Sequence, residues 1–584
     1  MRLQLLLCCA MALHAQVQRP EPSTYAAPDL SQMITRGGDL RDVVERYRAD
    51  ETSLSRFHTL PGSPTTLSAM RAFYEAWSTS LQRQVDFDTL GTEGRIDYVL
   101  FQNRLRYELR QLVEIKRRQD EMAHLIPFAP GIMQLHESRV RVDPIEPAKI
   151  AAHLDAMAKQ LAKPIAGCRA KPAECPEKKT VANRASRTVA EYRTILKNWF
   201  DFYNGYDPLF TWWVTEPYKR VDAALERYAA ELREKRAGVA KGDRDTIIGD
   251  PIGREALLLE LENEMIPYTP EQLVEIAKME FAWCDREMRK ASRELGFGDD
   301  WKKALEHVKT LHVEPGKQTA LIVEQAVEAM QFVEKNNLVT VPPLARDVWR
   351  VNMMSPERQR VNPFFLGGES IIVSFPTSTM THEQKMMSMR GNNIHFSHAT
   401  VFHELIPGHN LQVFMGQRYR PYRRAFSTPF WMEGWALYWE FLLWDMGFQK
   451  TPENRVGALF WRMHRCARII FSLSFHLEKM TASEAVEFLI DRVGHERENA
   501  AAEVRRSFET DYSPLYQVAY MMGGLQIRSL HEELVKTGKM SNREFHDRIL
   551  QGNTMPIEMV RASLTGRPPA KHYRPQWRFY GGIQ

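Results

Sequence analysis

Apolar residues recur at helical spacing along most of the chain from about Leu40 onward. In residues 221–238 (VDAALERYAAELREKRAG) and 270–295 (PEQLVEIAKMEFAWCDREMRKASREL) they fall at positions i, i+3, i+4 and i+7, with charged residues between them. This spacing collects the apolar side chains on one face of a helix. Gly238 closes the first segment and Gly296 follows the second, and glycine is typical of helix ends. The pattern therefore predicts a mainly α fold made of long amphipathic helices.

One segment breaks the helical pattern. Residues 369–376 (ESIIVSFP) are rich in β-branched and aromatic residues and are flanked by Gly367, Gly368 and Pro376, so they predict a short strand in a small β-sheet. Two interpretations are open. The strand edge could hold an extended peptide by main-chain hydrogen bonds, or the sheet could be purely structural.

The N-terminal residues 1–15 (MRLQLLLCCAMALHA) have the outline of a signal peptide: one Arg, a short apolar run and small residues at the end. We therefore expect an exported protein, periplasmic or secreted. Residues 16–584 would then form a single large helical domain, with two lobes flanking a cleft as the alternative. Cys8 and Cys9 do not follow the small residue expected of a lipoprotein signal, which favours a mature chain without a lipid anchor. No later stretch is apolar enough for a transmembrane segment.

Composition narrows the possible partners. The chain is 44% hydrophobic and 26% charged, with a formal net charge of +5, as in ordinary globular proteins. No block of Lys and Arg alternates with aromatic residues, so we expect no nucleic-acid partner. Cys168 and Cys175 lie in a Pro-rich segment and could form a local disulfide in an oxidising compartment. Cys284 and Cys466 lie in helical sequence and are expected to be buried thiols.

The segment HATVFHELIPGHNLQ (residues 398–412) carries the pair His403-Glu404 and a second histidine, His409. In the zinc motif H-E-x-x-H the histidines are four residues apart and meet one ion from one helical face. Here they are six residues apart, which is about 120° around a regular helix. Pro407 and Gly408 lie between them, and a helix breaks or bulges at such a pair. We therefore predict that a break brings His409 back toward His403.

A third ligand is predicted in an aromatic-rich helix, WMEGWALYWE (residues 431–440). Glu433 and Glu440 lie among large apolar residues, and a buried carboxylate needs a cation or another partner. Glu433 follows His409 by 24 positions, which leaves room for a loop and a return helix. These residues predict a zinc site with His403, His409 and Glu433 as ligands.

HELIPGHNLQ, EGWALYWE and the later PLYQVAYMMGG (residues 514–524) together resemble the bacterial family known as domain of unknown function 885. Its pattern contains H-E-x-x-P-G-H-x-x-Q and E-G-W-A-L-Y-x-E, followed by a Tyr/Gly segment. That family resembles helical zinc peptidases of the gluzincin type. The resemblance implies a large helical metallopeptidase-like fold with a deep cleft, Zn²⁺ on the three ligands named above, and Glu404 as catalytic base. Asn410 stands where many members carry a further histidine.

The resemblance also suggests Tyr520, in the Tyr/Gly segment, as a donor to the oxyanion; a core aromatic is the alternative interpretation. Further polar candidates near the motifs are Arg528, His476, His395 and His398.

We expect a zinc metallopeptidase that acts on short peptides through a metal-activated water. Two alternatives stay open: a zinc amidohydrolase that acts on a non-peptide amide or a modified amino acid, and a binding protein that has lost catalysis.

Overall fold

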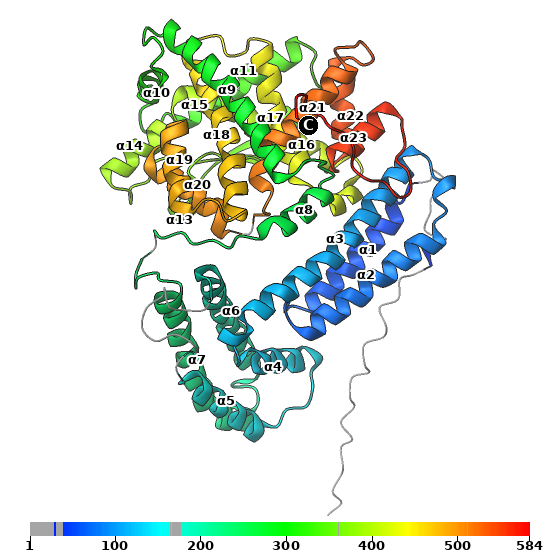
Figure 1. Cartoon of the computed structure of the whole chain (residues 1–584), viewed down its shortest axis with the longest axis vertical. Coiled ribbons are helices and arrows are strands. Elements are labelled where there is room, and N and C mark those ends of the chain that lie inside the picture. Colours follow the sequence, from blue (N-terminus) through cyan, green and yellow to red (C-terminus); the bar gives the residue numbers. More distant parts are fainter. Residues whose placement is uncertain are drawn as a thin grey trace, which may run out of the picture. The chain divides into compact units, whose positions relative to one another are not determined.

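The computed structural model describes residues 29–30, 39–163, 165, 177–243, 245–359, 361–510 and 512–583. The predicted signal peptide, residues 1–15, and the pair Cys168 and Cys175 lie outside these residues. Helices make up most of the described chain, and a single two-stranded sheet accompanies them (Figure 1). The prediction of a mainly α fold with a small β-sheet is confirmed.

The chain divides into two compact units. The first contains Leu54–Ala72 and Ile115–Arg244, and the second contains Ala27–Ser53, Phe73–Glu114 and Asp245–Gln584. Three of the boundaries fall inside the first three helices, which are α1 (Arg41–Phe57), α2 (Pro64–Gln84) and α3 (Thr92–Met122).

The first unit is built around four further helices with one apolar core. They are α4 (Ala129–Arg141), α5 (Pro147–Leu161), α6 (Lys179–Tyr203) and α7 (Pro208–Glu231). Trp199 and Phe210 meet edge to face in this core, with ring centroids 5.3 Å apart. Helix α7 begins at its N-cap Asp207 and runs into a π-helical turn, Leu232–Arg236, before Gly238 adopts a positive φ of 77°. The predicted helix end at Gly238 is thus reached through a turn of different pitch.

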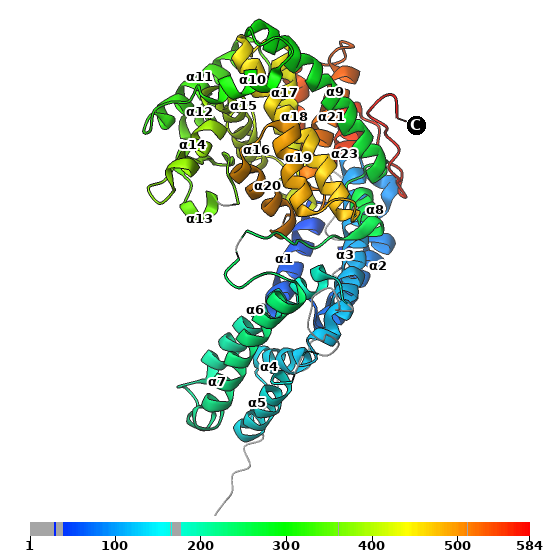
Figure 2. The same ribbon diagram turned by 60° about the vertical axis from the view of Figure 1, so that its left-hand side comes forward.

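The second unit holds most of the helices and both strands. Its elements are α8 (Gly253–Asn263), α9 (Pro270–Glu294), α10 (Trp301–Lys309), α11 (Gln318–Lys335), α12 (Pro343–Val348), β1 (Arg350–Met353), α13 (Pro356–Gln359), β2 (Ser370–Val373), α14 (His382–Gly391), α15 (Ile394–Glu404), α16 (His409–Gly416), α17 (Pro429–Asp445), α18 (Pro452–His476), α19 (Ala482–Val493), α20 (Arg497–Glu509), α21 (Tyr516–Leu534), α22 (Asn542–Gly552) and α23 (Ile557–Thr565). Figure 2 shows α15, α17, α18 and α21 together inside this unit.

Close backbone approaches hold these central helices together. Helix α17 is buried on nearly every side, and apart from Glu433 and Glu440 its buried residues are mostly apolar. It packs against α21 at Gly434, where an added Cβ would lie 2.5 Å from a backbone carbon of Gly523. Helix α18 packs against α15 at Gly457, where an added Cβ would lie 2.2 Å from the carbonyl oxygen of His395. Glycine therefore sets the spacing of the helices that carry the predicted ligands.

The predicted strand is present as β2, which pairs in parallel with β1, Ser370 opposite Arg350. On its other side, the backbone N–H and C=O of Ile372 both bond to Leu366, at 2.7 and 3.0 Å. The chain itself therefore occupies this edge at Ile372. A peptide-holding role for this strand stays a prediction.

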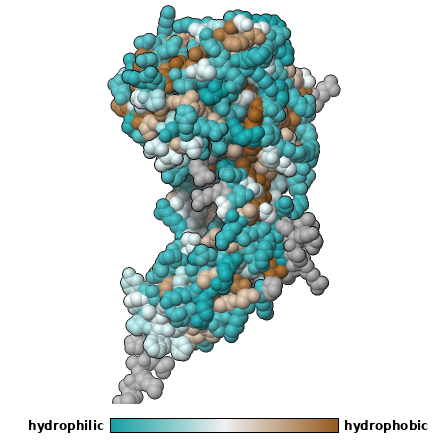
Figure 3. All heavy atoms as spheres, turned by 90° about the vertical axis from the view of Figure 1, so that its left-hand side faces the viewer, coloured by the Kyte–Doolittle hydropathy of each residue, from teal (hydrophilic) through white to brown (hydrophobic). Residues whose placement is uncertain are grey.

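Cys284 and Cys466 are free and buried, as predicted. None of the described helices combines the length and the apolar character needed to cross a lipid bilayer. Hydrophilic residues cover most of the face seen in Figure 3, and hydrophobic residues form small patches among them.

Candidate metal centre

The helix that carries His403 breaks where Pro407 and Gly408 predict. Helix α15 ends at Glu404, and α16 begins at His409. Between them the N–H of Gly408 bonds to the carbonyl oxygen of Phe402 at 3.0 Å, and an added Cβ on Gly408 would lie 1.9 Å from the carbonyl oxygen of His403. Only glycine allows the chain to fold back so closely. The rings of His403 and His409 come to 5.0 Å between centroids.

Glu433 reaches the same place from α17. Its Oε2 lies 3.1 Å from Nε2 of His409 and 3.8 Å from Nε2 of His403. A donor atom of each histidine and a carboxylate oxygen of Glu404 also lie within 4.8 Å of one another. Donors on a tetrahedral zinc with bonds of about 2.0–2.2 Å are separated by roughly 3.3–3.5 Å. The spacing of the three predicted ligand side chains therefore suits a single cation.

The two glutamates nearest the histidines have different surroundings. Burial alone would raise the pKa of Glu433, but His409 and His403 outweigh it and hold that pKa well below its ordinary value. The hydroxyl of Tyr516 donates to the other oxygen, Oε1, of the same carboxylate. For Glu404, burial raises the pKa above its ordinary value. Glu433 is thus fixed as an anion, whereas Glu404 can hold a proton more readily.

Glu440 lies behind His403 and orients its ring. Its Oε1 is 2.7 Å from Nδ1 of His403. Because an ionised carboxylate only accepts, Nδ1 carries a proton and donates, so Nε2, on the side of Glu433, is the nitrogen that would bind a metal after losing its own proton. Burial lowers the pKa of His403, but its hydrogen bonds to Glu433 and Glu440 outweigh this and raise it to about 9. Glu433 and Glu440 are seven residues apart, about two helical turns, so both face the histidines.

A cavity of about 210 Å³ opens beside these residues in the second unit. His403, Glu404, His409 and Glu433 all line it. The turn before β2 forms another wall, and an added Cβ on Gly367 would lie 2.3 Å from Oε2 of Glu404. The backbone can come this close to the carboxylate only because residue 367 has no side chain.

Tyr520, the predicted oxyanion donor, lines the same cavity. Its ring lies nearly parallel to that of His403, with centroids 6.2 Å apart. Nη2 of Arg506 is 3.5 Å from its hydroxyl oxygen. Burial raises the pKa of Tyr520 to about 12, so the hydroxyl keeps its proton at neutral pH.

The sequence reasoning missed several residues of the cavity. Arg465 and Arg468 of α18 and Arg506 of α20 line it, as does Tyr516. A signal was available: Arg465 and Arg468 lie three residues apart in a mostly buried stretch of α18, and residues at this spacing are neighbours on a helix surface.

The remaining polar candidates lie elsewhere. Nδ1 of His395 is 2.6 Å from Asn454, Nε2 of His398 is 3.0 Å from Glu328, and Arg528 pairs with Asp445 at 3.1 Å. His476 is buried at the end of α18. These four are not among the described residues that line the cavity.

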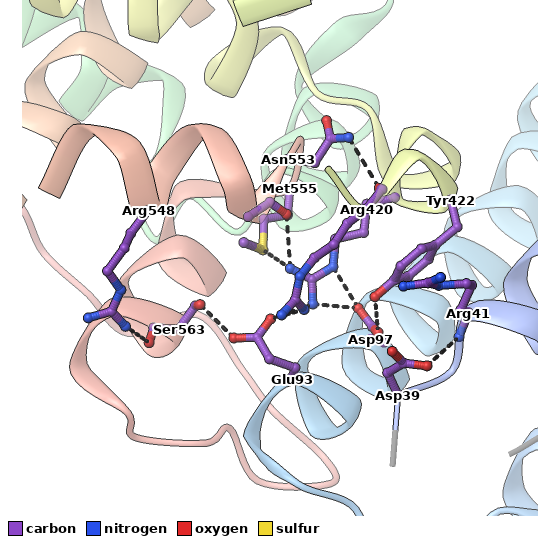
Figure 4. A network of polar contacts seen from close by, with 12 residues as sticks. Asp39, Arg41, Glu93, Asp97, Arg420, Tyr422, Arg548, Asn553, Met555 and Ser563 are labelled. Carbon is purple, nitrogen blue, oxygen red and sulfur yellow. Dashed lines mark hydrogen bonds and ion pairs between the residues drawn. The ribbon is translucent and has the colours of Figure 1, made fainter. Parts of the chain in front are cut away.

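The segment between His409 and Glu433 is anchored by buried charges. Arg423, in the 3₁₀ helix Pro421–Phe426, is fully buried and pairs with Asp97 of α3 at 2.7 Å. Its guanidinium also donates to Glu93 and to the carbonyl oxygen of Gly552. The hydroxyl of Tyr422 donates to the second oxygen of Asp97 at 2.7 Å (Figure 4). This network fixes the loop that leads from one predicted ligand to the next.

Two solved structures share the fold. A putative lipoprotein of unknown function from Shewanella oneidensis aligns with a TM-score of 0.66 and 18% identity, over 90% of this chain and 99% of that one. A putative lipoprotein from Colwellia psychrerythraea aligns with a TM-score of 0.55 and 16% identity, over 92% and 98%. No curated protein gave a match. The model of the family described as "Bacterial protein of unknown function (DUF885)" matches residues 55–564, which include every residue of the candidate centre, so the chain belongs to this family.

Proposed function

We propose that this protein is a zinc-dependent hydrolase that cleaves peptide bonds of short peptides. The observation that carries the proposal is the convergence of His403, His409 and Glu433, from three helices, at separations of 3.1 and 3.8 Å, with Glu404 beside them. A site that only stores zinc has no use for a free carboxylate next to the first ligand. This argues against a binding protein that has lost catalysis.

Each residue of the candidate centre has a separate role in the proposed hydrolysis. Nε2 of His403, Nε2 of His409 and the carboxylate of Glu433 would hold the ion. Bound zinc would lower the pKa of a water to about 7 and polarise the substrate carbonyl. Glu404 accepts the proton of the attacking water and passes it to the leaving nitrogen as the C–N bond breaks. Tyr520 donates its O–H to the developing oxyanion.

The size of the cavity favours small substrates. Its volume of about 210 Å³ is below the roughly 300–1,000 Å³ of typical drug-sized ligand sites. One or two residues fit beside the predicted ligands, and a folded protein does not. A non-peptide amide or a modified amino acid would also fit, and this second candidate shares the same machinery.

Export is part of the same proposal. The signal-like residues 1–15 support it, as do the similar structures described as putative lipoproteins. We propose a periplasmic or secreted location with cleavage near Ala15. Mass spectrometry of the mature N-terminus tests this: a free α-amino group there agrees, whereas a lipid-modified cysteine at the N-terminus contradicts the unanchored form.

Metal analysis and one variant test the catalytic proposal. Purified protein should contain about one zinc per chain, and a chelator should stop turnover of a mixture of short peptides. Glu404→Gln should keep the zinc and lose activity by a factor on the order of 100 to 10,000, as expected when a general base is removed. The exposed Glu383→Gln in α14 is the control. Undiminished activity of Glu404→Gln would show that another group accepts the proton.

A further inference from the structure

Three buried arginines form a cationic wall beside the candidate centre. Arg465 and Arg468 from α18 and Arg506 from α20 line the cavity that also contains His403 and Glu404. Their exposed fractions are only 4, 2 and 5%. Burying one guanidinium is unfavourable unless anions surround it. Three in one wall therefore call for an explanation.

Carboxylates of the described residues pair with only some of the N–H groups of these arginines. Nη2 of Arg465 lies 3.5 Å from Glu440, which already holds His403. Nε of Arg468 lies 2.6 Å from Glu503. Within the described part of the chain, each arginine keeps a buried nitrogen without a hydrogen-bond partner: Nε of Arg465, Nη1 of Arg468 and Nε of Arg506. The wall can accept another anion.

Aromatic rings hold the guanidinium groups in place. Arg465 and Arg468 lie 4.6 and 4.5 Å from the centroid of the Tyr520 ring, and Arg506 lies 4.6 Å from that of Tyr512. Planar guanidinium groups stacked in this way lose little freedom when they bind an anion, and their paired N–H groups match the two oxygens of a carboxylate. The wall is thus preorganised for a planar anion.

The wall lies one side chain away from the predicted metal ligands. Arg465 contacts the carboxylate that orients His403. The centroid of the Tyr520 ring is 6.2 Å from that of His403 and 4.5 Å from the guanidinium carbon of Arg468. An anion bound to the wall would share this cavity with a carbonyl held at the centre. The substrate's own terminus supplies such an anion.

We propose that Arg465, Arg468 and Arg506 bind the free α-carboxylate at the C-terminal end of the substrate. The substrate class is then a short peptide or an N-acyl amino acid, and the amide next to the terminal carboxylate is cleaved. Water adds its oxygen to the carbonyl carbon, the C–N bond breaks, and the proton goes to the nitrogen of the released amino acid. This direction of cleavage rests on the proposed function; the binding of the carboxylate does not.

A matched pair of substrates tests the inference on unaltered protein. One peptide is prepared with a free C-terminal carboxylate and again as the carboxamide, and kcat/KM is measured on the zinc-loaded enzyme. A site built to pair with a charged group rejects an analogue without it, so we expect the acid to be preferred by a factor on the order of 100 or more. Equal rates for acid and amide would overturn the carboxylate site and leave the hydrolase standing.

Variants identify the residues. Arg506→Gln should bring the acid-to-amide ratio close to one, and Arg506→Lys should recover part of it. Arg462→Gln is the matched control, because Arg462 is a buried arginine of the same α18, pairs with Glu280 at 2.6 Å and does not line the cavity. It should keep the ratio of the unaltered enzyme. A ratio that falls equally in both glutamine variants would assign the effect to general loosening of the unit and overturn the inference.

A binding measurement separates the two proposals. N-acetylalanine and N-acetylalaninamide are titrated into zinc-loaded Glu404→Gln protein, and into the same protein carrying Arg506→Gln, by calorimetry. N-acetylalanine should bind to the Glu404→Gln protein but not to the protein that also carries Arg506→Gln. If the unaltered enzyme hydrolyses neither short peptides nor N-acyl amino acids but N-acetylalanine still binds only when Arg506 is present, the proposed function fails and the carboxylate site stands. Equal binding of acid and amide overturns the site.

Discussion

Glu440 contacts the ring of His403 and not the space where the three predicted ligands meet. At the scale of single residues it is therefore a positioning group, and its charge makes Nε2 of His403 a better donor to a metal. Its neighbour on the helix face, Glu433, is the one that approaches both histidines.

Glu440→Gln should weaken zinc binding by about 10–100-fold, as is usual when a carboxylate behind a metal-bound histidine is neutralised. Competition with a chromophoric chelator measures the affinity. The exposed Glu383→Gln should bind zinc as the unaltered protein does. Unchanged affinity in Glu440→Gln would show that the ring of His403 is held by its packing alone.

Glu264 gives the second unit a pH-dependent stability. It is buried at the C-terminal end of α8, where burial raises its pKa to about 8 although the hydroxyl of Thr428 donates to it. In the unfolded chain its pKa is about 4.3. Between these two values the folded state holds a proton that the unfolded state has lost, so this group's contribution to stability falls as pH rises.

We therefore expect Glu264→Gln to gain stability relative to the unaltered protein as pH rises from 5 to 8. The difference in free energy of unfolding should change by up to about 1.4 kcal/mol per pH unit. Urea unfolding at several pH values measures it. Glu255→Gln, an exposed residue of the same helix, should show no such trend. A constant difference for Glu264→Gln would place its pKa in the folded state near the ordinary value.

At the scale of elements, the loop between α16 and α17 depends on the buried pair Arg423 and Asp97, each with an exposed side-chain fraction of 0%. Removing one member of such a pair leaves the other charge buried without compensation. The loss of stability would affect the segment between His409 and Glu433.

Arg423→Gln should lower the free energy of unfolding by about 3–5 kcal/mol, measured by urea unfolding. Adding Asp97→Asn to this variant should recover part of the loss, because the orphaned charge is then removed. If the effects of the two substitutions simply add, the pair is not the source of the stability.

At the scale of the whole molecule, a metal that binds only the folded state stabilises it by mass action. Chelator-treated protein should gain about 2.7 kcal/mol when free zinc reaches 100 times its Kd, with a higher Tm. Calorimetry at increasing zinc concentrations measures the shift. The double variant His403→Ala, His409→Ala should show no shift, and an equal response in this variant would mean that the stabilising zinc binds elsewhere.

The sequence determined the helical fold, because apolar residues spaced three and four positions apart lie on one face of a helix. Glycine at positions such as 296 marks a helix end. It also determined the break between α15 and α16, since the effect of Pro407 and Gly408 acts within one or two turns. The strand near residue 370 was visible for the same local reason. All of these depend on neighbours along the chain.

The sequence named Glu433 as the third ligand, but only the tertiary structure showed that Glu440 lies behind His403. The seven-residue spacing puts Glu433 and Glu440 on one face, and the packing of α15 and α16 against that face then separates their roles. The same holds for Arg506 and Tyr516, which reach the cavity from α20 and α21. Contacts between helices that are distant in sequence depend on how close the backbones come, here fixed by Gly434 and Gly457, and no local pattern carries that information.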